Sequence, residues 1–229
     1  MRSFRTAACA AALAGVALAG AALPGCVFHV GGNGVKGSGK IAEETRSVGA
    51  FDRIDIEGEA KLEATVGNGA PSLVIAADDN LLPLIGTELR GHTLRIYPKE
   101  PYNDTHGHGI RVRLTVPALR GVTVGGACSG TIDGVSGDEF DIEIAGAGQL
   151  TASGAAKLVR VRVSGSGEID IQKVTAESAE VDVSGAGHVR LTATASLDAK
   201  VSGVGDVRYA GNPPNVRRKV HGIGKIEPL

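Results

Sequence analysis

The sequence predicts an all-β solenoid, a parallel β-helix-like stack of coils of about 19 residues each. Three observations predict it. A Gly-x-Gly pair recurs through the second half of the chain, apolar residues alternate with polar ones on both sides of every pair, and charges at equivalent positions change sign from repeat to repeat. With 34 glycines and no tryptophan, the core is expected to consist of Val, Ile, Leu and Ala.

The glycine pairs mark the corners of the predicted coils. Their spacing of 18 to 20 residues is typical of a solenoid, in which each repeat is buried only by its neighbours. A looser copy begins at Gly126. Glycine permits positive φ and close approach of stacked backbones, so we assign the pairs to architecture. The corner glycines are Gly146, Gly148, Gly165, Gly167, Gly185, Gly187, Gly203, Gly205, Gly222 and Gly224.

The alternation around each pair is typical of strands with one buried face. Val181 and Val183 precede one pair, and Val189 and Leu191 follow it. Each repeat therefore reads as strand, corner, strand and a variable return. A serine precedes three of the pairs, and because a nucleophile is needed once but a corner residue once per coil, we expect corner hydrogen bonds. These serines are Ser164, Ser184 and Ser202.

The polar positions predict the register of the stack. Three residues before each pair the chain carries Glu143, Arg162, Asp182, Lys200 and Lys219. Five residues before each pair it carries Asp141, Arg160, Glu180, Asp198 and Arg217. Stacked coils would bring mostly opposite charges together, at about 0.2–1 kcal/mol per pair. We expect a solvated, mutually neutralised wall, which is a poor place for catalytic acids.

Residues 40–229 are expected to form a single domain, with an irregular front half over 40–124 and the Gly-x-Gly coils over 125–229. The front half keeps strand patterns such as FDRIDIEG and IRVRLTVP but lacks the glycine period. DDNLLPLIGTEL predicts a turn or short helix capped by Asp78 or Asp79. The alternative for these two carboxylates is a general acid and base pair.

The amino terminus reads as a processing segment. Residues 1–25 have the charged start and short apolar run of a lipoprotein signal peptide, and they lead into Leu-Pro-Gly-Cys, which resembles the lipobox of bacterial lipoproteins. We expect lipid on Cys26, a glycine-rich tether over 26–39, and an exported protein anchored to the cell envelope. Val27 after the cysteine favours the outer membrane in a Gram-negative host. An ordinary secretory signal is the alternative.

Two other motifs are assigned to structure. Within the tether, GVKGSGKI has Ile41 where a phosphate-binding loop needs Ser or Thr. Cys128 remains as the one thiol of the mature chain outside the lipobox, and we expect a small buried hydrophobe.

At the level of whole segments, the chain resembles a bacterial family. FDRIDIEGEAKLEATVG, PSLVIAADDNLLPLIGTELRGHTLRIYPK, VRLTVPALRGVTVGGA and the glycine coils, in this order over about 38–227, are similar to the auto-transporter adhesin, head GIN domain family. Gly58-Glu59-Ala60 stands where such proteins often carry Gly-Ile-Asn. The resemblance implies a right-handed parallel β-helix-like fold in exported or lipid-anchored proteins, and it brings no catalytic residues.

One segment is a weak candidate for metal binding. Asp104, His106 and His108 have a spacing of two, which in an extended segment would place all three on one side. Prolines before this stretch favour a solvated loop instead, so we expect no metal and no cofactor.

Two functional hypotheses follow. The first is a non-enzymatic, lipid-anchored envelope protein that presents a rigid solenoid surface for adhesion or for protein or glycan binding, with a homo-oligomer as a further possibility. The alternative is a polysaccharide-active β-helix enzyme, which would need a groove lined by unneutralised acids. The formal net charge of -1 gives no basic footprint, so nucleic acid is not expected as a partner.

Overall fold

The computed structural model describes residues 34–104 and 106–229, and every structural statement below concerns those residues. The signal peptide over 1–25, Cys26 and the first part of the expected tether lie outside them. No helix in the described part of the chain has the length and hydrophobicity of a membrane span.

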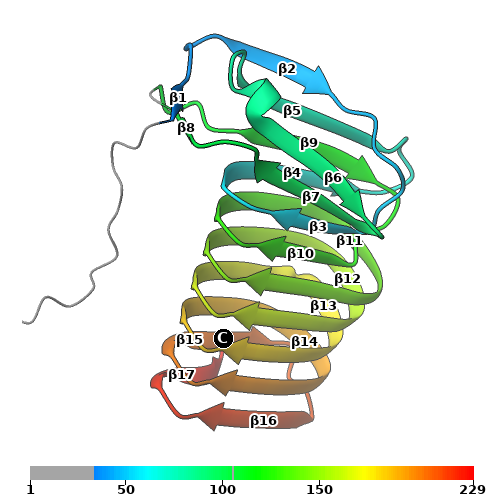
Figure 1. The fold of residues 1–229 in the computed structure, drawn as a ribbon. Coiled ribbons are helices and arrows are strands. Elements are labelled where there is room, and N and C mark those ends of the chain that lie inside the picture. Colours follow the sequence, from blue (N-terminus) through cyan, green and yellow to red (C-terminus); the bar gives the residue numbers. More distant parts are fainter. Residues whose placement is uncertain (1–33, 105) are drawn as a thin grey trace, which may run out of the picture. The chain divides into compact units, whose positions relative to one another are not determined.

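The second half of the chain forms a stack of parallel coils, as the glycine period predicts (Figure 1). Val163, Val183 and Val201 lie beside one another on successive coils, and the glycine pairs are in register along the stack. The strands are β10 (Gly121–Val124), β11 (Ala127–Ile144), β12 (Ala147–Val163), β13 (Ser166–Val183), β14 (Ala186–Val201), β15 (Val204–Ala210), β16 (Asn215–Val220) and β17 (Ile223–Pro228).

The four longest strands, β11 to β14, each run through almost a whole coil. The sequence suggests a variable return between two short strands, but the backbone of that return stays in the ladder. It turns at irregularities between Ile132 and Val135, between Thr151 and Ser153, and between Ile171 and Thr175. Because bulges bend a strand without ending it, each coil has one glycine corner and one bulged corner.

The front half contains two further coils of the same stack. β3 (Arg53–Ile56) and β4 (Glu59–Val66) pair in parallel with β10 and β11 on one side. On the other side they pair in parallel with β7 (Thr93–Pro98) and β9 (Arg111–Val116). The coil of 53–66 therefore lies between two coils that follow it in sequence. This order, and the loop between β7 and β9, hide the period that the sequence shows later.

Antiparallel strands cover the amino-terminal end of the stack, and we call this region the cap. β5 (Ser72–Asp78) pairs with β9 and with β2 (Ile41–Thr45), while β6 (Ile85–Arg90) pairs with β7. A 3₁₀ turn, Leu82–Leu84, connects β5 to β6. β1 (Val35–Lys36) pairs with β8 (Tyr102–Asn103), so the end of the segment expected to be a flexible tether is part of the cap.

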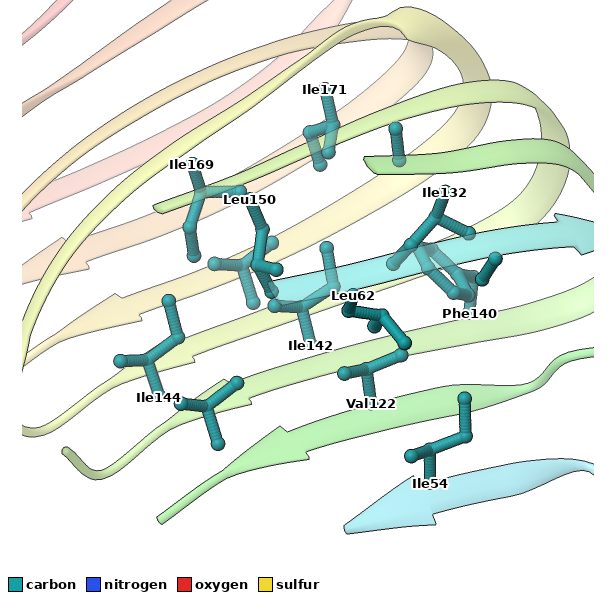
Figure 2. Close-up of a cluster of buried hydrophobic side chains, with 14 of the residues drawn as sticks. Ile54, Leu62, Val122, Ile132, Phe140, Ile142, Ile144, Leu150, Ile169 and Ile171 are labelled. Carbon is teal, nitrogen blue, oxygen red and sulfur yellow. The ribbon is translucent and has the colours of Figure 1, made fainter. Parts of the chain in front are cut away.

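The core consists of columns of apolar side chains that repeat from coil to coil. Ile54, Val122 and Ile142 follow one another in register and are almost completely buried (Figure 2). On the other wall, Leu150 and Ile169 are in register and buried, while Gly130 stands between Leu62 and Leu150, whose side chains fill the space beside it (Figure 2). Burying one such side chain stabilises the fold by about 1.5–3 kcal/mol, so the columns dominate its energetics.

The first glycine of each pair is required by close approach between coils. A Cβ added to Gly165 would lie 2.0 Å from the carbonyl oxygen of Gly146, and the same contact recurs along the column. Positive φ, the other reason given for these glycines, is found within the five pairs only at Gly205. The column comprises Gly58, Gly126, Gly146, Gly165, Gly185, Gly203 and Gly222.

The second glycine of each pair faces a different neighbour. At Gly148 and Gly167 an added Cβ would meet the side chain of Ile144, at 2.8 and 3.0 Å. At Gly224 it would lie 1.7 Å from the carbonyl oxygen of Gly205. Space is thus limited at both glycines of the corner, although for different reasons.

Candidate functional site

The candidate metal ligands do not come together as their spacing predicts. Asp104 lies in a turn, where its carboxylate accepts hydrogen bonds from the backbone N–H groups of His106, Gly107 and Gly109, at 3.2, 3.0 and 2.6 Å. These bonds hold the carboxylate within its own loop, and they lower the pKa of Asp104 against the effect of partial burial. The segment forms a turn, and not the extended strand in which a spacing of two would place all three side chains on one side.

Both imidazoles instead approach Asp78, from a different strand. His108 Nδ1 lies 2.9 Å from Asp78 Oδ1, His106 Nδ1 lies 3.8 Å from Asp78 Oδ2, and the two rings stack with centroids 5.9 Å apart. Among the polar and charged side chains of the described residues, only Asp78 is buried. No cluster of three His, Cys, Asp or Glu side chains in the described residues could hold a metal ion.

Asp78 also binds the segment that enters the cap. Its Oδ2 accepts a hydrogen bond of 2.8 Å from the backbone N–H of Gly39. The contact with His108, followed by this backbone bond, lowers the pKa of the Asp78 carboxyl below its ordinary value. Asp78 therefore stays ionised and joins the Gly39 segment to the His108 loop.

Asp79 has separate partners, so the two neighbouring carboxylates do not form an acid and base pair. Its Oδ1 accepts a hydrogen bond from the hydroxyl of Ser38. Neither aspartate caps the short helix, because the N-cap residue is Leu81 and no side chain caps it. The capping prediction is wrong: both carboxylates bind the glycine-rich segment instead.

The charged wall shows the pairing that the sequence predicts. Arg160 lies between Asp141 and Glu180 of the adjacent coils, with nitrogen to oxygen distances of 3.4 and 3.3 Å. Asp182 and Lys200 form a similar contact at 3.5 Å. Alternation of sign fails in the last coils, where Glu180 is in register with Asp198. Lys200 likewise stands beside Lys219.

A hollow interrupts the opposite wall, at the bulged corners of three successive coils. Its volume is about 350 Å³. We call it the bulge groove. It is lined by Thr131, Asp133, Thr151, Ala152, Ser153, Asp170, Gln172 and Lys173.

Two polar side chains of the bulge groove are oriented by hydrogen bonds to neighbouring carboxylates. Ser153 donates a hydrogen bond of 2.8 Å to Asp133, and Gln172 donates one of 3.4 Å to Asp170. Lys173 is exposed and forms no ion pair within the described residues. Hydroxyls, an amide, two carboxylates and an amine thus face one hollow, and their spare donors and acceptors suit a ligand rich in hydroxyl groups.

The corner serines and Cys128 have structural positions. The hydroxyls of Ser164 and Ser184 point to carbonyl oxygens of the preceding coil, at 3.5 and 3.4 Å, and the backbone N–H of Ser202 bonds to Val183. Cys128 is buried, and burial raises the pKa of its thiol to about 11. A thiol with that pKa is a poor nucleophile near neutral pH.

The bulge groove carries no signal in the sequence that would separate it from the rest of the wall. Thr131, Thr151 and Ser153 read as ordinary outward positions of alternating strands. These residues become neighbours only because bulges occur at the same corner of three successive coils. The alternation of apolar and polar residues in the sequence does not reveal where a single bulge occurs.

Fold and walls together define a β-solenoid whose outward side chains are largely polar. The sequence profile described as "Putative auto-transporter adhesin, head GIN domain" matches residues 50–213. The chain therefore belongs to this family. A comparison with curated proteins finds no match.

Solved structures show the same fold. A protein titled a putative adhesin from Bacteroides fragilis is 24% identical, with a TM-score of 0.68 over 86% of this chain and 100% of that one. One titled a putative lipid binding protein from Parabacteroides distasonis is 24% identical, with a TM-score of 0.52 over 85% and 99%. A further putative adhesin, from Parabacteroides merdae, is 18% identical, with a TM-score of 0.50 over 85% and 98%.

Proposed function

We propose that this chain is a non-enzymatic protein of the cell envelope, anchored by lipid at Cys26, whose solenoid presents a rigid polar surface for adhesion. The family description and the titles of two structural relatives support a role in adhesion. Stacked coils suit that role because they give an extended surface that needs no deep pocket.

The bulge groove is the observation that carries this proposal. Its walls are strands that pair on both sides of the bulges, so the backbone that carries its polar groups is held in place without a bound ligand. Its volume of 350 Å³ lies at the lower end of the range for small-ligand sites, about 300–1,000 Å³. We assign the groove to a short stretch of glycan, or to a polar loop of a protein partner.

A crosslinking pull-down from intact cells tests the proposal. Lys173→Ala removes the exposed amine of the groove, and Arg162→Ala is the matched control, because it removes an exposed charge from the other wall. We expect partners captured by the parent chain to be lost with Lys173→Ala and kept with Arg162→Ala. Equal capture by both variants would contradict recognition through the groove.

Two further experiments test membrane anchoring and enzymatic activity separately from partner binding. Cys26→Ala should release the protein from the membrane fraction and abolish capture at the envelope. Incubation with a panel of acidic polysaccharides should yield no new reducing or unsaturated ends. Appearance of such ends would support the enzyme alternative.

A further inference from the structure

The last coil of the described chain ends the stack with an unpaired strand edge. β16 pairs with β14 on one side, and no other strand of the described residues lies on its second side (Figure 1). An exposed edge offers a row of unpaired backbone N–H and C=O groups, to which another strand can add.

The charges on this edge differ from those on the coils inside the stack. Arg217 and Lys219 point outward, two residues apart, and neither forms an ion pair within the described residues. On the inner side they are in register with Asp198 and Lys200, so Lys219 has a like charge as its neighbour. The outer side of both cations has no neighbouring strand.

A coil inside the stack carries the same two basic positions, and its neighbours show which kind of strand pairs with them. Arg160 and Arg162 occupy the same two outward positions in β12. In the stack they are in register with Glu180 and Asp182 on one side, and Arg160 contacts Glu180 at 3.3 Å. On the other side they face Asp141 and Glu143. A strand with two carboxylates, two residues apart, thus neighbours the internal basic coil on both sides.

Apolar contact is available beside the basic edge. Val220 and Ile223 are 43% and 75% exposed. In the described residues, the exposed large apolar side chains lie only on the cap and on the last two coils, and none lies on the coils between. An added strand that alternates carboxylates with β-branched residues would cover Val220 while its acids face Arg217 and Lys219.

The position next to the core is closed to a further complete coil. Arg218 is in register with the buried Ala199, at the place where the inner coils carry apolar residues. Its guanidinium lies 5.2 Å from the ring centre of Tyr209 and donates to the Tyr209 hydroxyl. An inward charge of this kind disfavours an apolar residue beside it, so it opposes continuation of the apolar core by a second solenoid.

We propose that the edge of β16 binds an extended acidic segment of a partner protein by strand addition. The segment carries two carboxylates two residues apart, followed by a β-branched residue that would lie beside Val220. A second copy of this chain is disfavoured, because pairing two β16 edges would bring Arg217 and Lys219 against the same cations. The proposal is independent of the bulge groove, which lies on the other wall.

Binding of synthetic peptides to the full chain in detergent tests this proposal. The probe is a fluorescent peptide with the sequence of residues 178–183, Ser-Ala-Glu-Val-Asp-Val, and binding is followed by anisotropy. Its control has the same composition in the order Ser-Glu-Asp-Ala-Val-Val, which abolishes the alternation. We expect saturable binding of the first peptide and at least tenfold weaker binding of the second.

Variants locate the binding. Arg217→Glu with Lys219→Glu should weaken binding about tenfold or more, since two favourable cross-strand charge pairs become unfavourable. Lys61→Glu is the matched control, because Lys61 is an exposed lysine of β4, outside the bulge groove and without an ion pair in the described residues, and it should leave binding unchanged. Circular dichroism establishes that each variant is folded.

Three results would overturn the proposal. One is no binding at millimolar peptide. The second is equal binding of both peptides with displacement by polygalacturonate, which would make the edge a general anion site. The third is self-association in sedimentation velocity that the double variant abolishes, which would make a second copy the occupant.

Discussion

Replacing Gly185 by alanine adds a single Cβ atom and tests whether close approach of the backbones is the reason for the glycine column. The added Cβ would lie 2.0 Å from the carbonyl oxygen of Gly165 and 2.3 Å from that of Ser164, and both are backbone atoms that no rotamer change can move. The two coils must separate locally by about 1 Å, because Cβ contacts below 3.0 Å essentially do not occur. That movement strains the bonds from Gly185 and Ala186 to the preceding coil, at 3.0 and 2.8 Å.

The expected cost is about 3–6 kcal/mol, from two or three weakened hydrogen bonds at about 1 kcal/mol each and about 1–3 kcal/mol of overpacking. Because whole domains are stable by only about 5–15 kcal/mol, urea unfolding at 25 °C should show a large fall in midpoint.

Gly67→Ala is the matched control for this substitution. An added Cβ at Gly67 would meet nothing within 4 Å, so its effect should stay within about 1 kcal/mol, in either direction. If Gly185→Ala were as harmless as Gly67→Ala, close approach of the backbones would not be the reason for the column.

Three further predictions concern single side chains. Asp78→Asn should destabilise the protein at neutral pH. The difference in unfolding free energy between variant and parent should shrink as pH falls below about 4, because a carboxyl with a lowered pKa in the folded state loses its stabilising contribution when it is protonated. Urea unfolding from pH 2.5 to 7 measures this difference, and a constant value would contradict the prediction. Cys128, with a pKa raised to about 11, should resist iodoacetamide at pH 8 until urea unfolds the chain, as peptide mass spectrometry would show. Arg160→Gln should lower Tm in 50 mM NaCl and less so in 1 M NaCl, since salt screens its ion pairs; an equal loss at both concentrations would point to packing instead.

The repeat made the stack predictable from sequence. Alternation around Gly165 and Gly185 identifies the strands and the inward face, and the charge change from Arg160 to Glu180 gives the register. These patterns are local and recur, so the assignment of one coil is supported by the same pattern in the next coil. The coil of 53–66 lacks that check: Gly58 belongs to the glycine column, but its neighbours in the stack are separated from it by a long stretch of chain.

The cap cluster could not be predicted for a related reason. Asp78, His108 and Gly39 lie in three segments that only the tertiary fold brings together. The spacing of Asp104, His106 and His108 suggested one shared face because it assumed an extended strand. The hydrogen bonds from the loop backbone to Asp104 impose a turn instead, and an Asx-type turn of this kind is a common alternative wherever aspartate precedes glycine-rich sequence.

The coil architecture separates residues that maintain the fold from residues that meet solvent. Inward columns such as Ile54, Val122 and Ile142 have no freedom, because each contacts its equivalent in the next coil. Outward residues interact mainly with the neighbouring charged side chains, and each such pair contributes about 0.2–1 kcal/mol to stability. They can therefore be substituted without loss of the fold. Where three bulges coincide, or where a coil has no outer neighbour, even that constraint is weakened. Recognition is therefore expected at the bulge groove and at the edge of β16, the two places where outward side chains are least committed to the stack.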